Sequence, residues 1–218
     1  MTHLDQTNES DINFLSRLAQ ENDAIATVKN GNLLFMPTGT STTATGKPLP
    51  PVEIVKSIGD SFNFSLTEGD NFTAVRAYWH NLDTGKKGEI VVDENTKIEQ
   101  KAKTTKTGKV SKRKQNVIVQ SEPIETNANK IKSLRHTYKT EASALNGAVA
   151  TFKKMQRGVA TFTMTLAFGN PELMPELPAT IKGIKKEIDS TDWIISKVTH
   201  NLSDNGYTSA VEFEKNII

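Results

Sequence analysis

The residues best suited to bind a metal or move a proton are four histidines, and their spacing does not bring them together. They are His3, His80, His136 and His200. No two stand four residues apart, the spacing that puts two ligands of one zinc ion on the same helix face. Any two could still meet in the fold, but isolated histidines are the favoured interpretation. The chain has no cysteine, which excludes thiolate metal sites, disulfides and cysteine nucleophiles.

Loops that bind phosphate or carry a nucleophile are also missing. The segment from Gly39 to Gly46 is followed by Lys47, and this Gly-Lys sequence superficially resembles a Walker motif. Pro48 follows directly, where that motif needs a Ser or Thr to reach Mg²⁺. There is no G-x-S-x-G sequence either, so a nucleophile elbow is excluded.

Paired carboxylates are the remaining option for acid–base chemistry, as in glycosidases. The candidate pairs are Glu187 with Asp189 and Asp189 with Asp192. Both lie beside Ser190 and Thr191 in a segment typical of hydrogen-bonded turns. A calcium loop would need a Gly and a distal bidentate Glu, which are absent. We therefore predict no catalytic, cofactor-binding or metal-binding residues, and expect that the protein is not an enzyme and needs no cofactor.

The charge is uneven along the chain. The 218 residues carry 27 Lys or Arg and 25 Asp or Glu, a net charge of +2. Residues 97–114 hold eight of the basic residues and one Glu, a net +7, which leaves 19 basic and 24 acidic residues, a net −5, elsewhere. The length fits one large domain or two small ones. No apolar run approaches the roughly 20 residues that cross a bilayer, and no signal-peptide pattern begins the chain. A soluble protein assembled in a cytoplasm is expected.

The basic segment 97–114 has two interpretations. Eight positive charges would attract a phosphate backbone, and the binding would depend strongly on salt. However, the segment contains no aromatic residue to stack on a base, and only Ile98 and Val110 are large and apolar. A flexible, solvated loop is favoured, with contact to nucleic acid as the alternative. Trp79 and Trp193 are interpreted as core or subunit-interface residues rather than ligand platforms.

Periodicity predicts the elements that would position these residues. Ser10 caps a helix over 11–21, and Asn30-Gly31 joins strands 24–29 and 32–36 in a hairpin. Residues 37–51 form an exposed connection. The C-terminal part has a helix over 141–157 that ends at Gly158, and a hairpin at Asn205-Gly206. The remaining predicted strands are 53–58, 61–66, 72–80, 89–93, 116–120, 159–168, 179–184, 193–201 and 207–214.

These elements predict a mainly β protein with two helices (α+β), built from antiparallel β-barrel modules. Three consecutive segments are expected. Residues 1–37 form a helix and a β-hairpin, residues 38–130 a β-rich middle region with the flexible basic loop 97–114, and residues 131–218 a helix and an antiparallel β-barrel module.

Two stretches resemble a known family. Residues 3–37 contain Asn-Glu-Ser-Asp before Phe-Leu-x-Arg-Leu and a short hairpin. Residues 131–214 contain Leu-Arg-His-Thr-Tyr, Gly-Asn-Pro-Glu-Leu and Asp-Trp-x-x-x-x-Val-Thr-His in that order. Both are similar to the phage late control gene D proteins, which are related to the N-terminal hub domains of VgrG spike proteins. The interval 38–130 resembles the family only loosely.

The resemblance implies a structural baseplate hub of a contractile phage-like tail. Such hubs are homotrimers whose paired β-barrels adapt the sixfold tail tube to the trimeric spike. The implied partners are the spike, the tube protein and other baseplate proteins, with nucleic acid possible but not favoured, and the implied location is the virion tail. Because family members begin with a further barrel before the Asn-Glu-Ser-Asp segment, a C-terminal fragment or a truncated version is expected.

Two surfaces are candidate interfaces between subunits. One is the face of strand 161–165 that carries alternate threonines, and the other is the strand Tyr207–Phe213. The competing hypotheses are nucleic-acid contact through residues 97–114, and peptidoglycan cleavage by acidic residues, for which no catalytic arrangement is visible.

Overall fold

The chain folds into two compact units. The computed structural model describes residues 4–29, 31–66, 72–104, 110–119 and 130–217. The first unit comprises Met1–Gly69 and Lys154–Ile218, and the second comprises Asp70–Lys153. This division differs from the three consecutive segments 1–37, 38–130 and 131–218, because strand pairing joins parts of the middle and C-terminal segments into one sheet.

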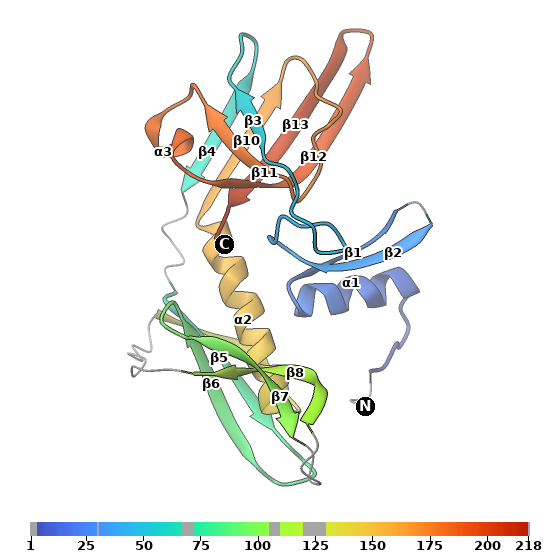
Figure 1. The fold of residues 1–218 in the computed structure, drawn as a ribbon, viewed down its shortest axis with the longest axis vertical. Helices are drawn as coiled ribbons and strands as arrows, with labels where there is room; N and C mark the ends of the chain where they lie inside the picture. Colours follow the sequence, from blue (N-terminus) through green and yellow to red (C-terminus); the bar gives the residue numbers. More distant parts are fainter. Residues whose placement is uncertain (1–3, 30, 67–71, 105–109, 120–129, 218) are drawn as a thin grey trace. The chain divides into compact units, whose positions relative to one another are not determined.

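The first unit begins with a helix and a hairpin, as predicted. Helix α1 spans Asp11–Glu21, and the side chain of Ser10 accepts a hydrogen bond from the Asn13 backbone N–H at 3.4 Å. Strands β1 (Ala24–Lys29) and β2 (Asn32–Pro37) pair antiparallel, and α1 lies against β1 (Figure 1). Gly31 has a φ of +74°, which suits a tight turn, while Asn30 lies outside the described residues.

A six-stranded sheet dominates this unit. Its order is β3-β11-β12-β13-β10-β4, and it curls as a half-barrel with β3 and β4 as its edges (Figure 1). Every pair is antiparallel except β3 with β11. The strands are β3 (Val52–Val55), β4 (Ser61–Leu66), β10 (Ala160–Leu166), β11 (Pro178–Lys182), β12 (Trp193–Ser203) and β13 (Gly206–Lys215). The barrel module predicted for the C-terminal part is therefore an open sheet rather than a closed barrel. It includes β3 and β4, which come from the middle of the chain.

Alternation of side chains along these strands builds the core of the first unit. Phe162 and Met164 are buried on one face of β10, whereas Thr163 and Thr165 on the other face are exposed. Phe162 packs against Trp193 and Phe213, with ring centroids 5.6 and 5.2 Å apart. The indole Nε1 of Trp193 donates to the Ile188 carbonyl at 2.9 Å. Trp193 is thus a core residue, and Ile188 belongs to α3 (Lys186–Asp189), a short helix that the periodicity does not predict.

The second unit has a three-stranded sheet in the order β6-β5-β9. Strands β5 (Ala74–His80) and β6 (Lys87–Asp93) form an antiparallel hairpin, and β9 (Ile131–Tyr138) runs parallel to β5. Helix α2 (Glu141–Gly158) starts in this unit, and its buried residues include Ala144, Leu145 and Ala148. The fold class predicted from the sequence, mainly β with helices, is confirmed. Three helices rather than two occur in the described residues, and two strand pairs are parallel.

The described parts of the basic segment 97–114 form strands, contrary to the prediction of a loop. It contributes β7 (Ile98–Thr104) and most of β8 (Val110–Ile118), which pair antiparallel as a two-stranded ribbon. Backbone hydrogen bonds hold such a ribbon together without a buried face, so a shortage of apolar residues does not forbid it. Ile98 also lies opposite Ile118, where the ribbon begins. Residues 105–109, between the strands, lie outside the described residues.

Candidate assembly surfaces

The three histidines that the structure describes lie on three different strands. His80 lies on β5, His136 on β9 and His200 on β12, while His3 lies outside the described residues. In the parts of the chain that the structure describes, no three His, Cys, Asp or Glu residues could hold a metal ion. His200 instead contacts residues of the neighbouring strand β13. Its Nδ1 lies 3.0 Å from the Ser209 hydroxyl and 2.8 Å from the Tyr207 hydroxyl.

The candidate carboxylate pairs belong to a structured turn. Asp189 accepts hydrogen bonds from the backbone N–H groups of Gly183 and Ile184, at 3.1 and 3.2 Å. This carboxylate therefore closes the connection between β11 and α3. Glu187 lies on the same short helix, with its side chain exposed. The interpretation of these acidic residues as turn residues agrees with this geometry.

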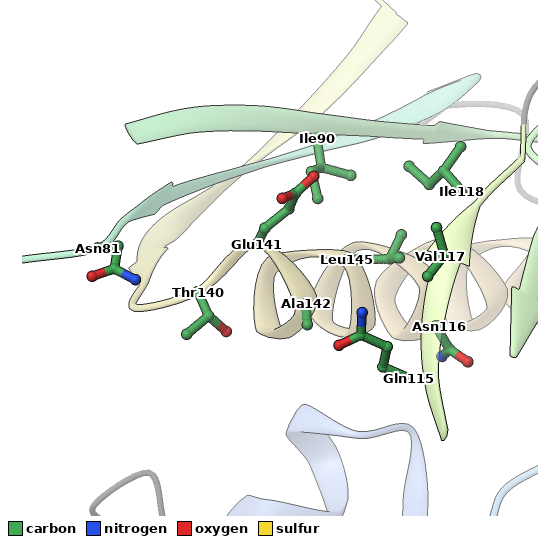
Figure 2. A pocket seen from close by; sticks show the side chains of 10 residues that line it. All are labelled: Asn81, Ile90, Gln115, Asn116, Val117, Ile118, Thr140, Glu141, Ala142 and Leu145. Carbon is green, nitrogen blue, oxygen red and sulfur yellow. The ribbon is translucent and has the colours of Figure 1, made fainter. Parts of the chain in front are cut away.

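A pocket of about 430 Å³ lies in the second unit, but its lining lacks a catalytic arrangement. Figure 2 shows the side chains of residues 115–118 of β8 around it, together with Thr140 and with Glu141, Ala142 and Leu145 of α2. The lining contains one carboxylate, that of Glu141. The other lining groups include the side-chain amides of Asn81, Gln115 and Asn116 and several apolar side chains. Neither a second acid nor a histidine lines the pocket, so general acid–base chemistry has no pair of groups there.

The first unit contains a buried group of charges around Arg157. The guanidinium of Arg157, at the end of α2, hydrogen-bonds both carboxylate oxygens of Asp23, one of them through Nη1 at 2.8 Å. Its Nε donates to Glu214 of β13 at 3.3 Å. Only 4% of the Arg157 side chain and 13% of the Asp23 side chain are exposed. Burial opposes the charged form, but the hydrogen bonds and negative charges of Asp23 and Glu214 outweigh it and raise the pKa of Arg157.

Glu176 extends this group, which we call the Arg157 cluster (Arg157, Asp23, Glu214 and Glu176). Its carboxylate accepts a hydrogen bond from the Gly39 backbone N–H at 2.8 Å. Burial raises the pKa of Glu176, and the Gly39 hydrogen bond and the Arg157 charge oppose that rise only in part. The backbone of Glu176 has a φ of +72°, a left-handed conformation that is unusual for a non-glycine residue. The hydrogen bond to Gly39 helps to hold that conformation in place.

The Arg157 cluster fastens the N-terminal helix and hairpin to the sheet. Asp23 directly precedes β1, and Gly39 follows β2, so both ends of the hairpin are held. One face of that hairpin is apolar and exposed, with Val28, Leu33 and Phe35 at 64%, 52% and 48% exposure. Contiguous exposed apolar side chains of this kind are typical of protein interfaces. The cluster thus fixes the position of one candidate assembly surface within the first unit.

The outer face of the six-stranded sheet carries the predicted threonine row. Thr163 and Thr165 are exposed, and Thr161 is half-buried. Thr163 lies between Asn63 of β4 and Glu212 of β13 in the strand register. This face is therefore polar, uncharged toward the β4 edge and uncovered by any other described part of the chain.

The prediction that Tyr207–Phe213 forms an interface between subunits is wrong. Ser209, Val211 and Phe213 are at most 1% exposed, and the last two pack in the core of the sheet. The alternation that distinguished this face reflects its burial within the first unit. Alternation alone does not tell an internal core from an interface, because both need an apolar face.

Strand β4 forms one edge of the six-stranded sheet. In the described residues it pairs with β10 alone, in an unbroken register from Ser61 to Leu66. It contains no charged residue and no proline, and Phe62 and Leu66 are 41% and 53% exposed. The opposite edge, β3, is short, carries Glu53 and follows Pro50 and Pro51. Natural proteins protect edges with charge, proline and short length, so an unprotected edge is typical of strands that pair with another chain.

Comparison with known proteins identifies the family of the chain. The family described as "Phage tail baseplate hub (GPD)" matches residues 1–206. The chain belongs to this family. The resemblance noted from the sequence is thereby confirmed. The family is named for the baseplate hub of the phage tail.

Two curated relatives cover almost the whole chain. A "Probable baseplate hub protein" of Escherichia phage 186 is 36% identical over 97% of the chain, and its counterpart in Escherichia phage P2 is 37% identical over 97%. The chain spans 57% of the length of each relative. These relatives imply a location in the virion tail. No helix in the described parts of the hub chain is both long and apolar enough to cross a membrane.

Solved tail proteins share the fold of this hub chain. A tail protein from Neisseria meningitidis MC58 matches 97% of the chain and 56% of its own length, with a TM-score of 0.57 and 13% identity. The 43 kDa tail protein of prophage MuSo2 from Shewanella oneidensis matches 95% of the chain and 53% of its own length, with a TM-score of 0.52 and 13% identity. At these identities the likeness concerns the fold.

Proposed function

We propose that the chain is a non-enzymatic structural subunit of a baseplate hub, and that copies of it associate through strand β4. The observation that carries this proposal is the unprotected β4 edge of an open half-barrel in a member of the hub family. A strand from a neighbouring copy would satisfy the free backbone groups of β4 and cover Phe62 and Leu66.

A threefold ring is the assembly that we propose for these copies. In such a homotrimer each contact joins two different surfaces, and rotation closes the ring. The trimer would adapt the sixfold tail tube to a trimeric spike in a contractile tail, after assembly in the host cytoplasm. Its partners would be the tube protein, the spike and other baseplate proteins. The support is the family and the fold shared with tail proteins.

Analytical ultracentrifugation of the 218-residue chain tests the role of the edge. The double variant Asn63→Lys/Ser65→Lys places charges on β4 at exposed positions, away from the core. We expect self-association to weaken at least about tenfold, because each new lysine opposes strand addition. The matched control is Thr163→Lys/Thr165→Lys, on the same face but one strand inward. If the control weakens association equally, the face rather than the edge mediates contact.

Quantitative mass spectrometry of purified tail particles tests the hub role itself. Particles from a strain that encodes the chain should contain it in the same number of copies as the spike protein. A chain that is absent from assembled tails, although expressed, would contradict the proposal. This outcome is separate from the edge experiment, which concerns only how copies associate.

A further inference from the structure

The basic ribbon, defined as Lys97 with strands β7 and β8, is an arm held at its base. At that base Asn116 Nδ2 donates to Asn146 Oδ1 of α2 at 3.1 Å, and residues 115–118 line the pocket beside the start of α2 (Figure 2). The Val119 backbone N–H also donates to the Lys97 carbonyl at 2.7 Å. Beyond this base, the closest contacts of each strand among the described residues are with its ribbon partner. Beyond the base, the described side chains of the ribbon, at 99–102, 110 and 114, are exposed.

Positive charge predominates in the ribbon. Residues 97–104 and 110–114 contain six Lys or Arg and one Glu. Among the ribbon side chains that the structure describes, the single ion pair joins Lys101 to Glu99 at 3.4 Å, and both side chains are more than half exposed. With six basic residues and one Glu, these ribbon residues keep a net charge of +5. The ribbon thus keeps a strong positive field available to a polyanion.

The strand register places cations on both faces of the ribbon. Lys101 lies opposite Gln115, and Lys114 lies opposite Ala102. Because Lys101 and Ala102 are neighbours on β7, Lys101 and Lys114 occupy opposite faces, and both are exposed. An acidic protein surface would meet one face only. The major groove of duplex DNA admits a two-stranded ribbon between two walls of phosphates, and so uses both faces.

We propose that the basic ribbon binds duplex DNA through its phosphates, without selecting a base sequence. The absence of aromatic residues from 97–118 argues against stacking on unpaired bases, and therefore against a single-stranded ligand. This inference goes beyond the hub role, since a structural subunit does not require DNA contact. It also replaces the interpretation of this segment as a solvated loop. A paired ribbon has a regular shape that fits the major groove, whereas a flexible loop has no fixed shape.

Fluorescence anisotropy with a labelled duplex of about 24 base pairs tests this proposal in the 218-residue chain. If about six phosphates are contacted, affinity should fall about a thousandfold as salt rises from about 50 to about 200 mM. The ribbon variant replaces five residues with Gln, which removes charge while leaving backbone pairing intact, and its circular dichroism should match the wild type. These residues are Lys101, Lys103, Lys112, Arg113 and Lys114. We expect it to lose at least about a hundredfold in affinity and most of the salt dependence.

A charge-matched control separates the ribbon from general attraction. It replaces five exposed lysines outside the ribbon with Gln, namely Lys29, Lys47, Lys86, Lys153 and Lys186. This control should bind within about threefold of the wild type, because those residues do not contact the DNA. An equal loss in both variants would overturn the proposal. So would tighter binding of a single-stranded oligonucleotide, more effective competition by polyglutamate than by duplex DNA, or no binding at low salt.

Discussion

At the scale of single residues, Arg157 stabilises the first unit through a partner that is distant in the sequence. Its guanidinium binds Asp23, which is 134 positions away in the chain. Removing one partner of a buried pair leaves an uncompensated charge, so Arg157→Ala should lower the free energy of unfolding by about 3–5 kcal/mol. Arg157→Lys should lose less, because it keeps the charge but not the paired hydrogen bonds. Urea denaturation followed by circular dichroism measures both changes.

The exposed ion pair of Arg17 provides the control for Arg157. Arg17 binds Glu9 at 2.6 Å on the surface of α1, with 42% of the Arg17 side chain exposed. In the same urea denaturation, Arg17→Ala should lower the free energy of unfolding much less than Arg157→Ala, because the Arg17 side chain is far more exposed to water than that of Arg157. If the Arg17 and Arg157 variants were equally stable, burial would not determine the contribution of the Arg157 cluster.

Glu176 should make the first unit less stable as pH rises. Burial raises the pKa of its carboxyl above the unfolded value, so the charged form is disfavoured in the folded chain. The corresponding stability is present below the unfolded pKa and disappears as pH rises through the folded pKa. Glu176→Gln keeps an oxygen acceptor for Gly39 and removes one of three carboxylates around a single Arg157. We expect this variant to exceed the wild type in stability near neutral pH.

The measurement for Glu176 is the urea midpoint as a function of pH. The advantage of Glu176→Gln should shrink as pH falls below the ordinary range of a carboxyl group, where the wild-type side chain is also neutral. An advantage that is the same at acidic and neutral pH would show that charge is not its cause. Glu176→Ala gives the opposite reference, since it removes the acceptor and leaves the Gly39 N–H unpaired.

At the scale of elements, α2 contains a glycine that the fold requires. A Cβ added at Gly147 would lie 2.0 Å from the Tyr138 hydroxyl oxygen and 2.4 Å from the ring carbon that bears it. Replacing a helical glycine with alanine ordinarily favours the helix by about 1 kcal/mol. Here overlap with Tyr138 should reverse the sign, so that Gly147→Ala lowers the free energy of unfolding by about 1–3 kcal/mol. Thermal denaturation followed at 222 nm would measure it.

Gly158, the last residue of α2, is the matched control for Gly147. A Cβ there would meet nothing within 4 Å. Gly158→Ala should therefore be neutral or stabilising. If both substitutions lowered the free energy of unfolding equally, the role assigned to Tyr138 would be contradicted, because Tyr138 lies beside Gly147 and not beside Gly158.

The same elements show how far the sequence leads. Local signals predicted α1 from the Ser10 cap and β10 from its alternation, because caps and alternation act over a few residues. Strand β9 was not predicted, since Ile131–Tyr138 is polar and pairs with β5, more than 50 residues away. The ribbon was missed because pairing, rather than burial, holds it together. Nor did any local signal identify the Arg157 cluster. Arg157 lies in the last turn of α2, and its partners come from distant parts of the chain, so they are determined by tertiary structure.

At the scale of the whole molecule, the two units each have a core of their own. Val75 of β5 is 0% exposed in the second unit, and Val211 of β13 is 1% exposed in the first. Truncating a buried valine to alanine removes contacts and leaves a cavity, which costs about 2 kcal/mol. If each unit opens as a cooperative block, Val75→Ala should accelerate hydrogen exchange about 30-fold in β5 and β6. It should leave β10 and β13 unchanged, and Val211→Ala should give the reverse pattern. Native-state exchange read by mass spectrometry resolves the two sets of peptides. Acceleration of all these strands by either substitution would show that the chain unfolds as one block, in which case the Arg157 cluster would stabilise both units rather than the first alone.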